Sequence, residues 1–286
     1  MPAIRSYIDW YSDSPDSNHP GGREVVVFST RSPQKTTRNE DSVAWIAWSE
    51  ALLIVLADGV GGQPGGGETS ELVVSLMVDR FKNINDGEIS QDLFREGVLD
   101  AYEEANRVIW DLGTGSGTTL TVVTIIRDTV RVFNVGDSST LVCGGKGKLK
   151  FTNTPHSPTG YAVAAGVLDA DEALHHKERH LISNIVGSPE MHIDIGPVLR
   201  LAKRDRILVA SDGLWDNMYM NEIIDAIKLV PSSRAAQLLI QTCSNRMSND
   251  GGNLPGHADD LSFVVVRSVA RKVKAHVGQE KAGSGV

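Results

Sequence analysis

The chain has 286 residues and a formal net charge of −8, and its apolar content is sufficient for one large domain with a sizeable core. The acidic balance argues against a nucleic-acid surface, because such surfaces bind phosphates through clustered Lys and Arg. The two cysteines do not suit a disulfide-stapled fold. No apolar run approaches the roughly 20 residues that cross a bilayer, and the N-terminus lacks the pattern of a signal peptide. These features predict a cytoplasmic protein without a membrane span.

The first half of the chain predicts strands followed by helices. Residues 1–23 are expected to form an N-terminal extension that precedes the domain. Apolar, β-prone runs at 23–30 and 51–58 predict strands, and the second is apolar on both faces, as in a central strand. Apolar residues at helical spacing then predict amphipathic helices over 68–84 and 89–112.

The middle of the chain predicts three closely spaced strands, at 119–127, 129–137 and 139–145. The short polar turns between them favour antiparallel hairpins. Residues 152–197 are irregular and rich in His, Pro and charge, which is typical of a functional excursion from a compact domain. We call this segment the flap and predict that it is mobile and shapes access to a site.

The remaining segments predict one more strand and helix layer. A strand is expected to end near residue 210, followed by helices over 221–230 and 232–247 and a last strand near 259–268. The basic tail, 269–286, is low in large apolar residues and is expected to be disordered. Together the elements favour antiparallel sheets covered by helices in layers.

Acidic residues recur at the ends of these predicted strands. They are Glu40, Asp41, Asp58, Asp137, Asp212, Asp259 and Asp260. If they meet at one end of a sheet, they will repel one another unless cations lie between them. Oxygen ligands with few His and no Cys nearby select Mg²⁺ or Mn²⁺ over Zn²⁺. Two such ions can position and activate a water for in-line attack on phosphorus.

Each motif taken singly is weak. An Asp-Gly pair after a strand is often an ordinary turn, and paired aspartates before a strand also suit a guarded sheet edge. The many glycines suggest a P-loop nucleotide enzyme, but both Gly-rich segments miss the G-x-x-x-x-G-K-[ST] spacing. The order and spacing of the motifs together are more specific than any one of them.

The ordered motifs resemble those of the PPM-type metal-dependent phosphatases, the type 2C serine/threonine phosphatases, in their bacterial form. The matching stretches, within residues 24–268, are NED, ADGVGG, GSGTTLTVV, FNVGDSS, ASDGLWD and DDLSFVVV. The resemblance implies an α+β fold, a four-layer α-β-β-α sandwich of two antiparallel sheets flanked by helices. It also implies a phosphatase that acts on phosphoserine and phosphothreonine in proteins, a partner Ser/Thr kinase and a monomer.

The resemblance further implies the ligands of two Mg²⁺ or Mn²⁺ ions. Asp58 matches the carboxylate that bridges both ions, and Gly59 matches a residue whose carbonyl oxygen is a ligand. Asp212 and Asp259 match the other direct ligands of one ion. With Asp58 they are the predicted catalytic residues, because the ions that they hold activate the attacking water.

Other site residues implied by the resemblance lie further from the direct ligands. Glu40 and Asp41 match carboxylates that act largely through waters bound to the second ion. Asp137 matches a residue that, with the Asp212 position, can hold a third and weaker ion. The segment 117–119 matches a motif that we assign to strand packing.

Three departures from the family pattern affect the mechanism. Thr36 stands where the family usually has an arginine that binds the substrate phosphate, so Lys35 or Arg38 is the candidate for that role. Val60 replaces a histidine that many eukaryotic members have, and Asp260 replaces the usual Asn. A catalytically silent binding module is the alternative function. The missing arginine supports it, whereas the presence of every matching metal carboxylate opposes it.

The histidines and one tryptophan have simpler interpretations. His176 and His180 have the spacing of a helical metal pair but lack the metalloprotease glutamate, so a polar flap face is expected. His156 either contacts the site or satisfies a loop backbone. Trp215 is interpreted as a packing residue.

Overall fold

The computed structural model describes residues 1–60, 65–248 and 254–268. Its strands are β1 (Ala3–Ile8), β2 (Asp16–Asn18), β3 (Arg23–Thr30), β4 (Asp41–Ala47), β5 (Ala51–Val60), β6 (Gly117–Thr118), β7 (Leu120–Ile126), β8 (Thr129–Val135), β9 (Ser139–Cys143), β10 (Leu149–Thr152), β11 (Asp194–Ile195), β12 (Leu199–Arg200), β13 (Arg206–Ala210) and β14 (Leu261–Ser268). Its α-helices are α1 (Gly66–Phe81), α2 (Gln91–Leu112), α3 (Pro158–Ala164), α4 (Ala170–Ala173), α5 (Asp212–Trp215), α6 (Met220–Ile227) and α7 (Ser232–Ser248). The predicted tail, 269–286, lies outside the described residues.

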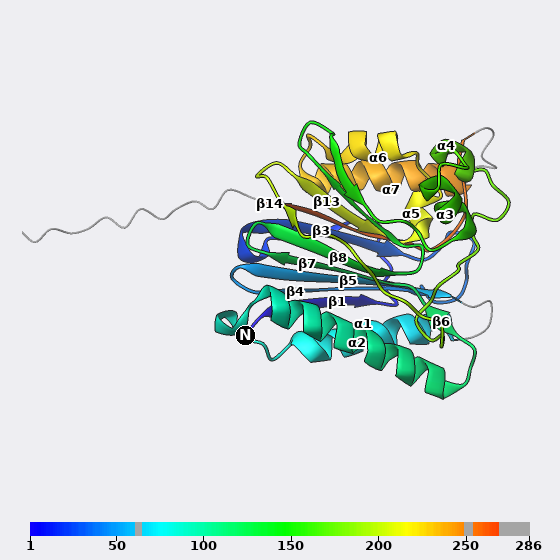
Figure 1. Ribbon diagram of the computed structural model, residues 1–286. Helices are drawn as coiled ribbons and strands as arrows, with labels where there is room; N and C mark the ends of the chain where they lie inside the picture. Colours follow the sequence, from blue (N-terminus) through cyan, green and yellow to red (C-terminus); the bar gives the residue numbers. More distant parts are fainter. Residues whose placement is uncertain (61–64, 249–253, 269–286) are drawn as a thin grey trace, which may run out of the picture.

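The strands form two antiparallel sheets that pack face to face (Figure 1). The first sheet has the order β1-β4-β5-β7-β8-β11, with β6 paired to β5 and β12 paired to β8. The second has the order β10-β9-β13-β14-β3-β2. Helices α1 and α2 cover the outer face of the first sheet, and α6 and α7 cover that of the second. The α+β four-layer sandwich implied by the resemblance is therefore confirmed.

Strand β5 lies at the centre of the first sheet and is buried on both faces. Leu53 and Val55 pack into the core under α1 and α2. Leu52 and Ile54 pack into the core between the sheets. Because successive side chains of a strand point to opposite faces, a run that is apolar at every position fits only a strand covered on both sides. The sequence-based prediction of a central strand is confirmed.

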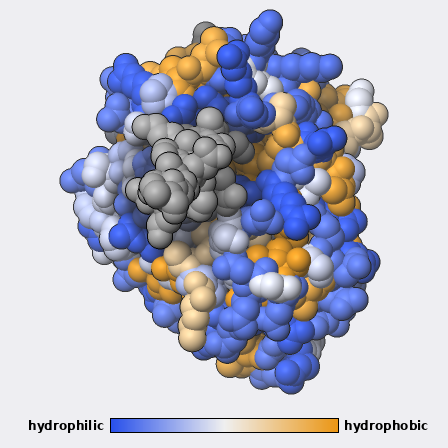
Figure 2. Space-filling view, turned by 90° about the vertical axis from the view of Figure 1, so that its left-hand side faces the viewer, coloured by the Kyte–Doolittle hydropathy of each residue, from blue (hydrophilic) through white to orange (hydrophobic). Residues whose placement is uncertain are grey.

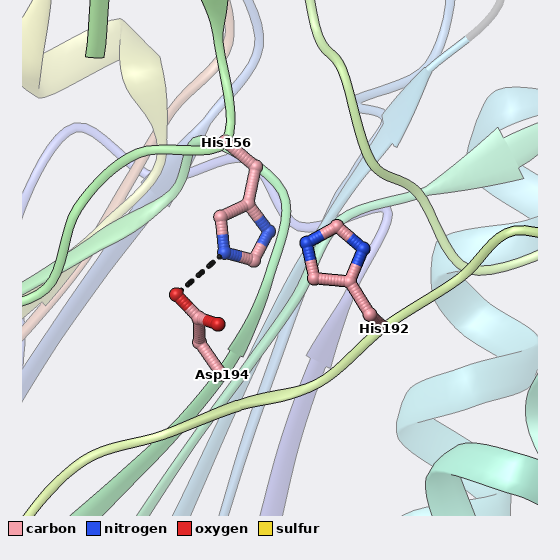
Figure 3. Close-up of side chains that lie close together, drawn as sticks. All are labelled: His156, His192 and Asp194. Carbon is pink, nitrogen blue, oxygen red and sulfur yellow. Dashed lines mark ion pairs between the residues drawn. The ribbon is translucent and has the colours of Figure 1, made fainter. Parts of the chain in front are cut away.

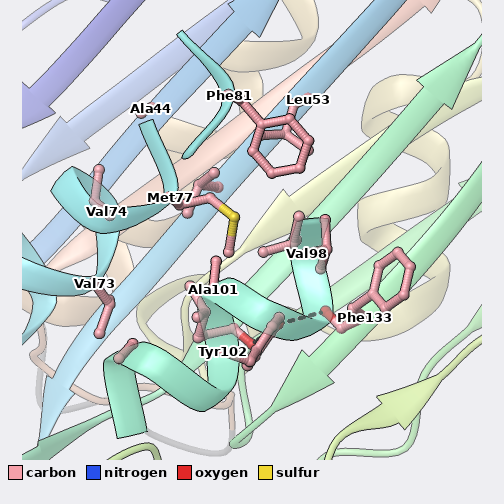
Figure 4. Close-up of a cluster of buried hydrophobic side chains, with 14 of the residues drawn as sticks. Ala44, Leu53, Val73, Val74, Met77, Phe81, Val98, Ala101, Tyr102 and Phe133 are labelled. Carbon is pink, nitrogen blue, oxygen red and sulfur yellow. Dashed lines mark hydrogen bonds between the residues drawn. The ribbon is translucent and has the colours of Figure 1, made fainter. Parts of the chain in front are cut away.

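Helix α2 is bounded by local signals and anchored to the first sheet by a buried tyrosine. It begins after Ser90, whose Oγ accepts the N–H of Leu93 at 3.1 Å, and ends at Gly113, which has a φ of 65°. The hydroxyl of Tyr102 lies 2.7 Å from the carbonyl oxygen of Leu120 and 3.0 Å from that of Phe133 (Figure 4). A buried phenol with its hydroxyl satisfied adds packing without a desolvation penalty, so α2 is held firmly over β7 and β8.

Two predictions about the path of the chain are wrong. Residues 1–23 are not an extension outside the domain, because β1 pairs with β4 and β2 pairs with β3. Most side chains of β1 are exposed, so this edge strand lacks the apolar pattern that would have predicted it. The polar turn after β8 does not close a hairpin, since β8 lies in the first sheet and β9 in the second. A short polar link has the same sequence pattern whether it closes a hairpin or joins two sheets.

The surface at one end of the sandwich has no large apolar patch in view. Figure 2 shows the end that lies at the left of Figure 1, where hydrophilic side chains dominate and hydrophobic ones form small separate patches. In the described ranges, no helix has the length and apolar character needed to cross a membrane. The predicted acidic residues lie at the other end of the sheets, near β6 and the flap helices α3 and α4 (Figure 1).

Candidate metal centre

Two of the predicted aspartates lie side by side at the end of the first sheet. Asp41 begins β4 and is the register partner of Asp58, near the end of β5. The carbonyl oxygen of Asp58 accepts the N–H of Thr119 and the Oγ1 hydroxyl of Thr118, both at 2.8 Å. The N–H of Asp58 donates to Oγ1 of Thr119 at 3.0 Å. These threonines, which we had assigned to packing, therefore also fix the main chain that carries Asp58.

The second sheet brings three more aspartates to the same place. Asp212 follows β13, Asp259 precedes β14, and Asp137 lies where the chain crosses from β8 to β9. Since β13 is antiparallel to both β14 and β9, these three chain segments meet at one end of the sheet. The Oγ of Ser211 donates to Oδ2 of Asp41 at 2.9 Å, which joins the ends of the two sheets.

The main chain after Asp58 passes through a space that admits only glycine. A Cβ placed on Gly59 would lie 2.1 Å from the carbonyl oxygen of Gly66. A Cβ placed on Gly66 would lie 2.9 Å from Oε1 of Glu40 and 2.9 Å from the carbonyl oxygen of Gly59. Those two oxygens therefore approach the same point beside α1. This arrangement is compatible with the ligand roles predicted for Gly59 and Glu40.

The aspartates in the centre strongly disfavour one another's ionised forms. Burial first, and the charge of Asp260 second, raise the pKa of Asp41 to about 8. Burial raises the pKa of Asp137 to about 7. The pKa values of Asp58 and Asp212 are raised well above the usual range, first by burial and then by the neighbouring carboxylates. The cluster therefore needs positive charge before all of these groups can ionise at neutral pH.

The same cluster offers oxygen atoms that nothing else in the protein satisfies. Oδ1 of Asp41, Oδ1 of Asp137, Oδ1 of Asp212 and Oδ2 of Asp216 are buried and have no hydrogen-bond partner within the described part of the chain. Buried polar atoms are normally paired, so unpaired oxygens at one place indicate a missing ligand. Hard divalent cations take oxygen ligands. The donor set therefore fits Mg²⁺ or Mn²⁺, and an ion would both satisfy these oxygens and favour ionisation.

Asp216 is a member of the cluster that sequence reasoning missed. It lies four residues after Asp212, at the C-terminal end of α5. Burial first, and the charge of Asp137 second, raise its pKa to about 7. The Nε of Arg179, from the flap, lies 3.7 Å from Oδ2 of Asp216. The i, i+4 spacing within ASDGLWD is the signal that could have placed Asp212 and Asp216 on one side of a helix.

Lys35 is the cation that lies against the carboxylates. Its Nζ donates to Oε2 of Glu40 at 2.7 Å and to Oδ2 of Asp260 at 3.0 Å, and it lies 3.7 Å from Oδ1 of Asp259. Burial alone would lower the pKa of Lys35, but Glu40 and Asp260 raise it well above its usual value. Asp260 also accepts the N–H groups of Ser32 and Glu40, each at 2.7 Å. The carboxylate that replaces the family's Asn therefore holds both Lys35 and the loop that carries it.

The other predicted phosphate-binding candidate lies against α1 instead. The guanidinium of Arg38 donates to Glu71 at 3.0 Å and to Glu68 at 3.5 Å. Thr36, at the position of the family's arginine, is exposed. Of the two candidates, Lys35 is the one that the structure places beside Asp259.

His156 joins the flap to the loop that carries Asp137. Its Nδ1 accepts the N–H of Gly136 at 3.1 Å, and its Nε2 lies 3.0 Å from Oδ2 of Asp194, beside the ring of His192 (Figure 3). Nε2 is buried and makes no hydrogen bond within the described residues, so Asp194 is near it only within ion-pair distance. Within the described residues, one potential ligand atom from each side chain of Figure 3 lies within 4.8 Å of the other two, but His192 and Asp194 are exposed, and such groups are common without an ion. Of the two interpretations of His156, the structure favours the satisfied loop backbone.

The remaining flap histidines do not share a helical face. Helix α4 ends at Ala173, so both His176 and His180 lie beyond it. The Nδ1 of His176 accepts the N–H of Glu178 at 3.2 Å, and the Nε2 of His175 lies 3.1 Å from the hydroxyl of Tyr219. The expectation that these side chains belong to a polar face of the flap fits this geometry.

The comparison with known protein families identifies the family of the chain. The family model described as Protein phosphatase 2C matches residues 30–253, which include each predicted ligand except Asp259. The chain belongs to the protein phosphatase 2C family. The match ends before β14, but the antiparallel pairing of β14 with β13 still places Asp259 beside Asp212.

Relatives within the phosphatase 2C family include proteins of bacteria. Protein phosphatase PhpP of Streptococcus pneumoniae is 29% identical over 241 residues, which cover 82% of this chain and 93% of that protein. The serine/threonine phosphatase of S. agalactiae is 25% identical, with a TM-score of 0.73 over 86% of this chain and 99% of that one. The catalytic domain of the phosphatase PstP, in complex with two manganese ions, is 24% identical, with a TM-score of 0.69 over 86% of this chain and 98% of that one.

The loop between β3 and β4, which carries Lys35, is tied to the residue that precedes β14. The pair formed by Lys35 and Asp260 joins residues that are 225 positions apart in the sequence. Asp260 is buried, with 3% of its surface exposed, and its hydrogen-bond donors are Lys35 and the N–H groups of Ser32 and Glu40. Lys35 therefore places a cation at the edge of the cluster.

Proposed function

We propose that this chain hydrolyses phosphoserine and phosphothreonine in proteins with the help of two bound Mg²⁺ or Mn²⁺ ions. One observation carries the proposal: carboxylates from both sheets converge at one end of the sandwich and leave buried oxygens without partners. The family supports it, since relatives are named protein phosphatases and one is described with two manganese ions. The clustered negative charge also explains why a phosphate would need cations in order to approach.

Named residues would divide the binding of the ions. Asp58, Asp212, Asp259 and the carbonyl oxygen of Gly59 would hold the ions directly. Glu40 and Asp41 would act largely through waters. When bound, divalent ions lower the pKa of a water and offset the charge of the phosphate. Asp137, with Asp212, would supply a third and weaker position.

Besides the metal ligands, the protein would contribute a positive charge, the ammonium of Lys35, at a fixed place beside the ions. The ammonium of Lys35 would bind a phosphate oxygen beside Asp259, in place of the arginine that is absent at position 36. Asp260 would keep this ammonium in position, because it accepts from Lys35 and from two main-chain N–H groups. The threonines behind Asp58 would prevent that carboxylate from moving when the charge at the centre changes.

The proposal is tested by turnover of p-nitrophenyl phosphate and of a phosphothreonine peptide in Mn²⁺, Mg²⁺ or EDTA. We expect turnover that requires the metal, is abolished in Asp58→Asn, and is retained in Asp111→Asn, which changes an exposed aspartate on α2. Comparison of the two metals at equal concentration identifies the preferred ion. If the folded, metal-loaded protein turns over neither substrate, it acts as a silent binding module instead.

Further parts of the proposal concern the cellular setting. A phosphatase of this kind would act on phosphoproteins made by a partner Ser/Thr kinase, in signalling within the cytoplasm, and as a monomer. Size-exclusion chromatography with light scattering tests the oligomeric state. Fractionation of cells that express a tagged chain tests the location.

A further inference from the structure

A cavity of about 310 Å³ lies between the flap and the second sheet and is not used by the chemistry described above. Asp137 and Asp212, two of the candidate metal ligands, line one part of it. Arg179 and Asp216 also line it, and their 3.7 Å contact ties the flap to α5. The cavity is therefore continuous with the carboxylate cluster.

Most of the cavity wall is apolar. Val163 and Ala164 contribute from α3, Ala173 from α4, and Met218 and Met220 from the chain that follows α5. Met218 is 3% exposed and belongs to the core of the second sheet, so this side of the cavity is rigid. The opposite side is the flap, where three alanines, Ala164, Ala170 and Ala173, stand at lining positions and leave the space open.

We infer that this cavity receives an apolar side chain adjacent to the phosphorylated residue of a protein substrate, an inference that rests on the proposed phosphatase function. Pockets that hold drug-sized molecules measure roughly 300–1,000 Å³, so this one is at the lower limit and suits a single side chain. Consecutive Cα atoms are about 3.8 Å apart, so a residue next to one bound at the cluster reaches a cavity that begins at Asp137 and Asp212. Apolar walls favour substrates with an apolar side chain at this position, because binding then removes apolar surface from water.

The flap therefore selects substrates by their sequence as well as covering the site. A substrate with Leu or Phe beside the phosphothreonine fills the cavity, whereas one with Gly leaves it filled with water. The difference between a Leu or Phe side chain and Gly in an apolar pocket changes kcat/KM by roughly tenfold or more. p-Nitrophenyl phosphate has no residues beside its phosphate group, so its turnover reports on the metal centre alone.

The experiment compares phosphothreonine peptides that differ only at the residue before or after the phosphothreonine, with Leu, Phe, Gly or Asp there. We expect kcat/KM to be roughly tenfold higher for the Leu or Phe peptide than for the Gly peptide in one of the two series. Ala164→Phe fills the cavity and is expected to remove this ratio. Ala165→Phe, which changes the adjacent exposed residue that does not line the cavity, is expected to keep it.

Two results would overturn the inference. One is equal kcat/KM for all peptides in the wild-type protein, and the other is an unchanged Leu-to-Gly ratio in Ala164→Phe. If neither p-nitrophenyl phosphate nor any of the phosphothreonine peptides is hydrolysed, the proposed function fails separately. The same peptides are then titrated calorimetrically into the metal-loaded protein, where equal affinities for the Leu and Gly peptides would reject the cavity as an apolar subsite.

Discussion

Replacement of Asp260 by Asn tests whether this buried carboxylate organises the loop that carries Lys35. Asp260 accepts three hydrogen bonds, from the N–H groups of Ser32 and Glu40 and from the ammonium of Lys35. The amide of Asn has one acceptor oxygen, so its NH₂ group must face at least one of these donors. A near-isosteric change thus leaves a buried donor unpaired and removes the charge from the bonds that remain.

The expected loss follows from those three bonds. An unpaired buried N–H costs about 1–3 kcal/mol, and the loss of charge assistance at the others adds about 1 kcal/mol. Lys35 keeps 30% of its side chain exposed, so its ion pair is screened and contributes little more. Relief of repulsion with Asp41 acts in the opposite direction, but a pKa of about 8 keeps Asp41 protonated at pH 6. We therefore expect the free energy of unfolding to fall by about 3 kcal/mol for Asp260→Asn at pH 6.

Urea unfolding in EDTA at pH 6 measures this loss, and p-nitrophenyl phosphate kinetics in Mn²⁺ measure its effect on the site. Asp205→Asn is the matched control, because Asp205 is 5% exposed, accepts the N–H of Ala202 at 2.8 Å and binds Lys150. Both variants should lose stability, but only Asp260→Asn should raise KM, since it alone frees Lys35. The reasoning is refuted if Asp260→Asn unfolds within about 0.5 kcal/mol of the wild type, or if both variants raise KM equally.

Three further predictions address the cation, the glycine and the pH dependence. Lys35→Met should raise KM for p-nitrophenyl phosphate by roughly tenfold or more, while Lys35→Arg retains most of the affinity. An unchanged KM in Lys35→Met would show that Lys35 does not bind the phosphate. Gly59→Ala should lower the melting temperature and weaken Mn²⁺ binding measured by calorimetry, because its Cβ would lie 2.1 Å from a carbonyl oxygen, whereas Gly87→Ala, with no atom within 4 Å of the new Cβ, should do neither. In EDTA, the melting temperature should fall as the pH rises from 5 to 8, because Asp41 and Asp137 have folded-state pKa values of about 8 and about 7, above those of the unfolded chain, so the folded state binds more protons in this range. Saturating Mn²⁺ should flatten this slope, and a melting temperature that does not change with pH in EDTA would contradict the assignment of raised pKa values.

Much of the fold could be predicted from local patterns along the chain. The helical spacing of apolar residues predicts α1 and α2, and the uninterrupted apolar run predicts β5 as a central strand. These patterns are readable because side-chain periodicity depends only on residues that are close in sequence. The edge strand β1 escapes such reasoning, since its exposed side chains show no apolar pattern and only its main-chain pairing with β4 places it.

In the candidate site, too, some features are predicted by the sequence and others depend on the tertiary structure. The order of the acidic motifs predicts most of the carboxylates that lie at the centre, because each follows or precedes a strand whose end the fold brings there. Tertiary structure alone decided that Lys35 lies beside Asp259 while Arg38 binds α1, since the two cations differ by three positions in one loop. It also decided that Asp216 joins the cluster and that an apolar cavity adjoins it. Contacts between residues more than 200 positions apart, such as Lys35 and Asp260, depend on which strands pair, here β3 with β14, and no local pattern in the sequence encodes that pairing.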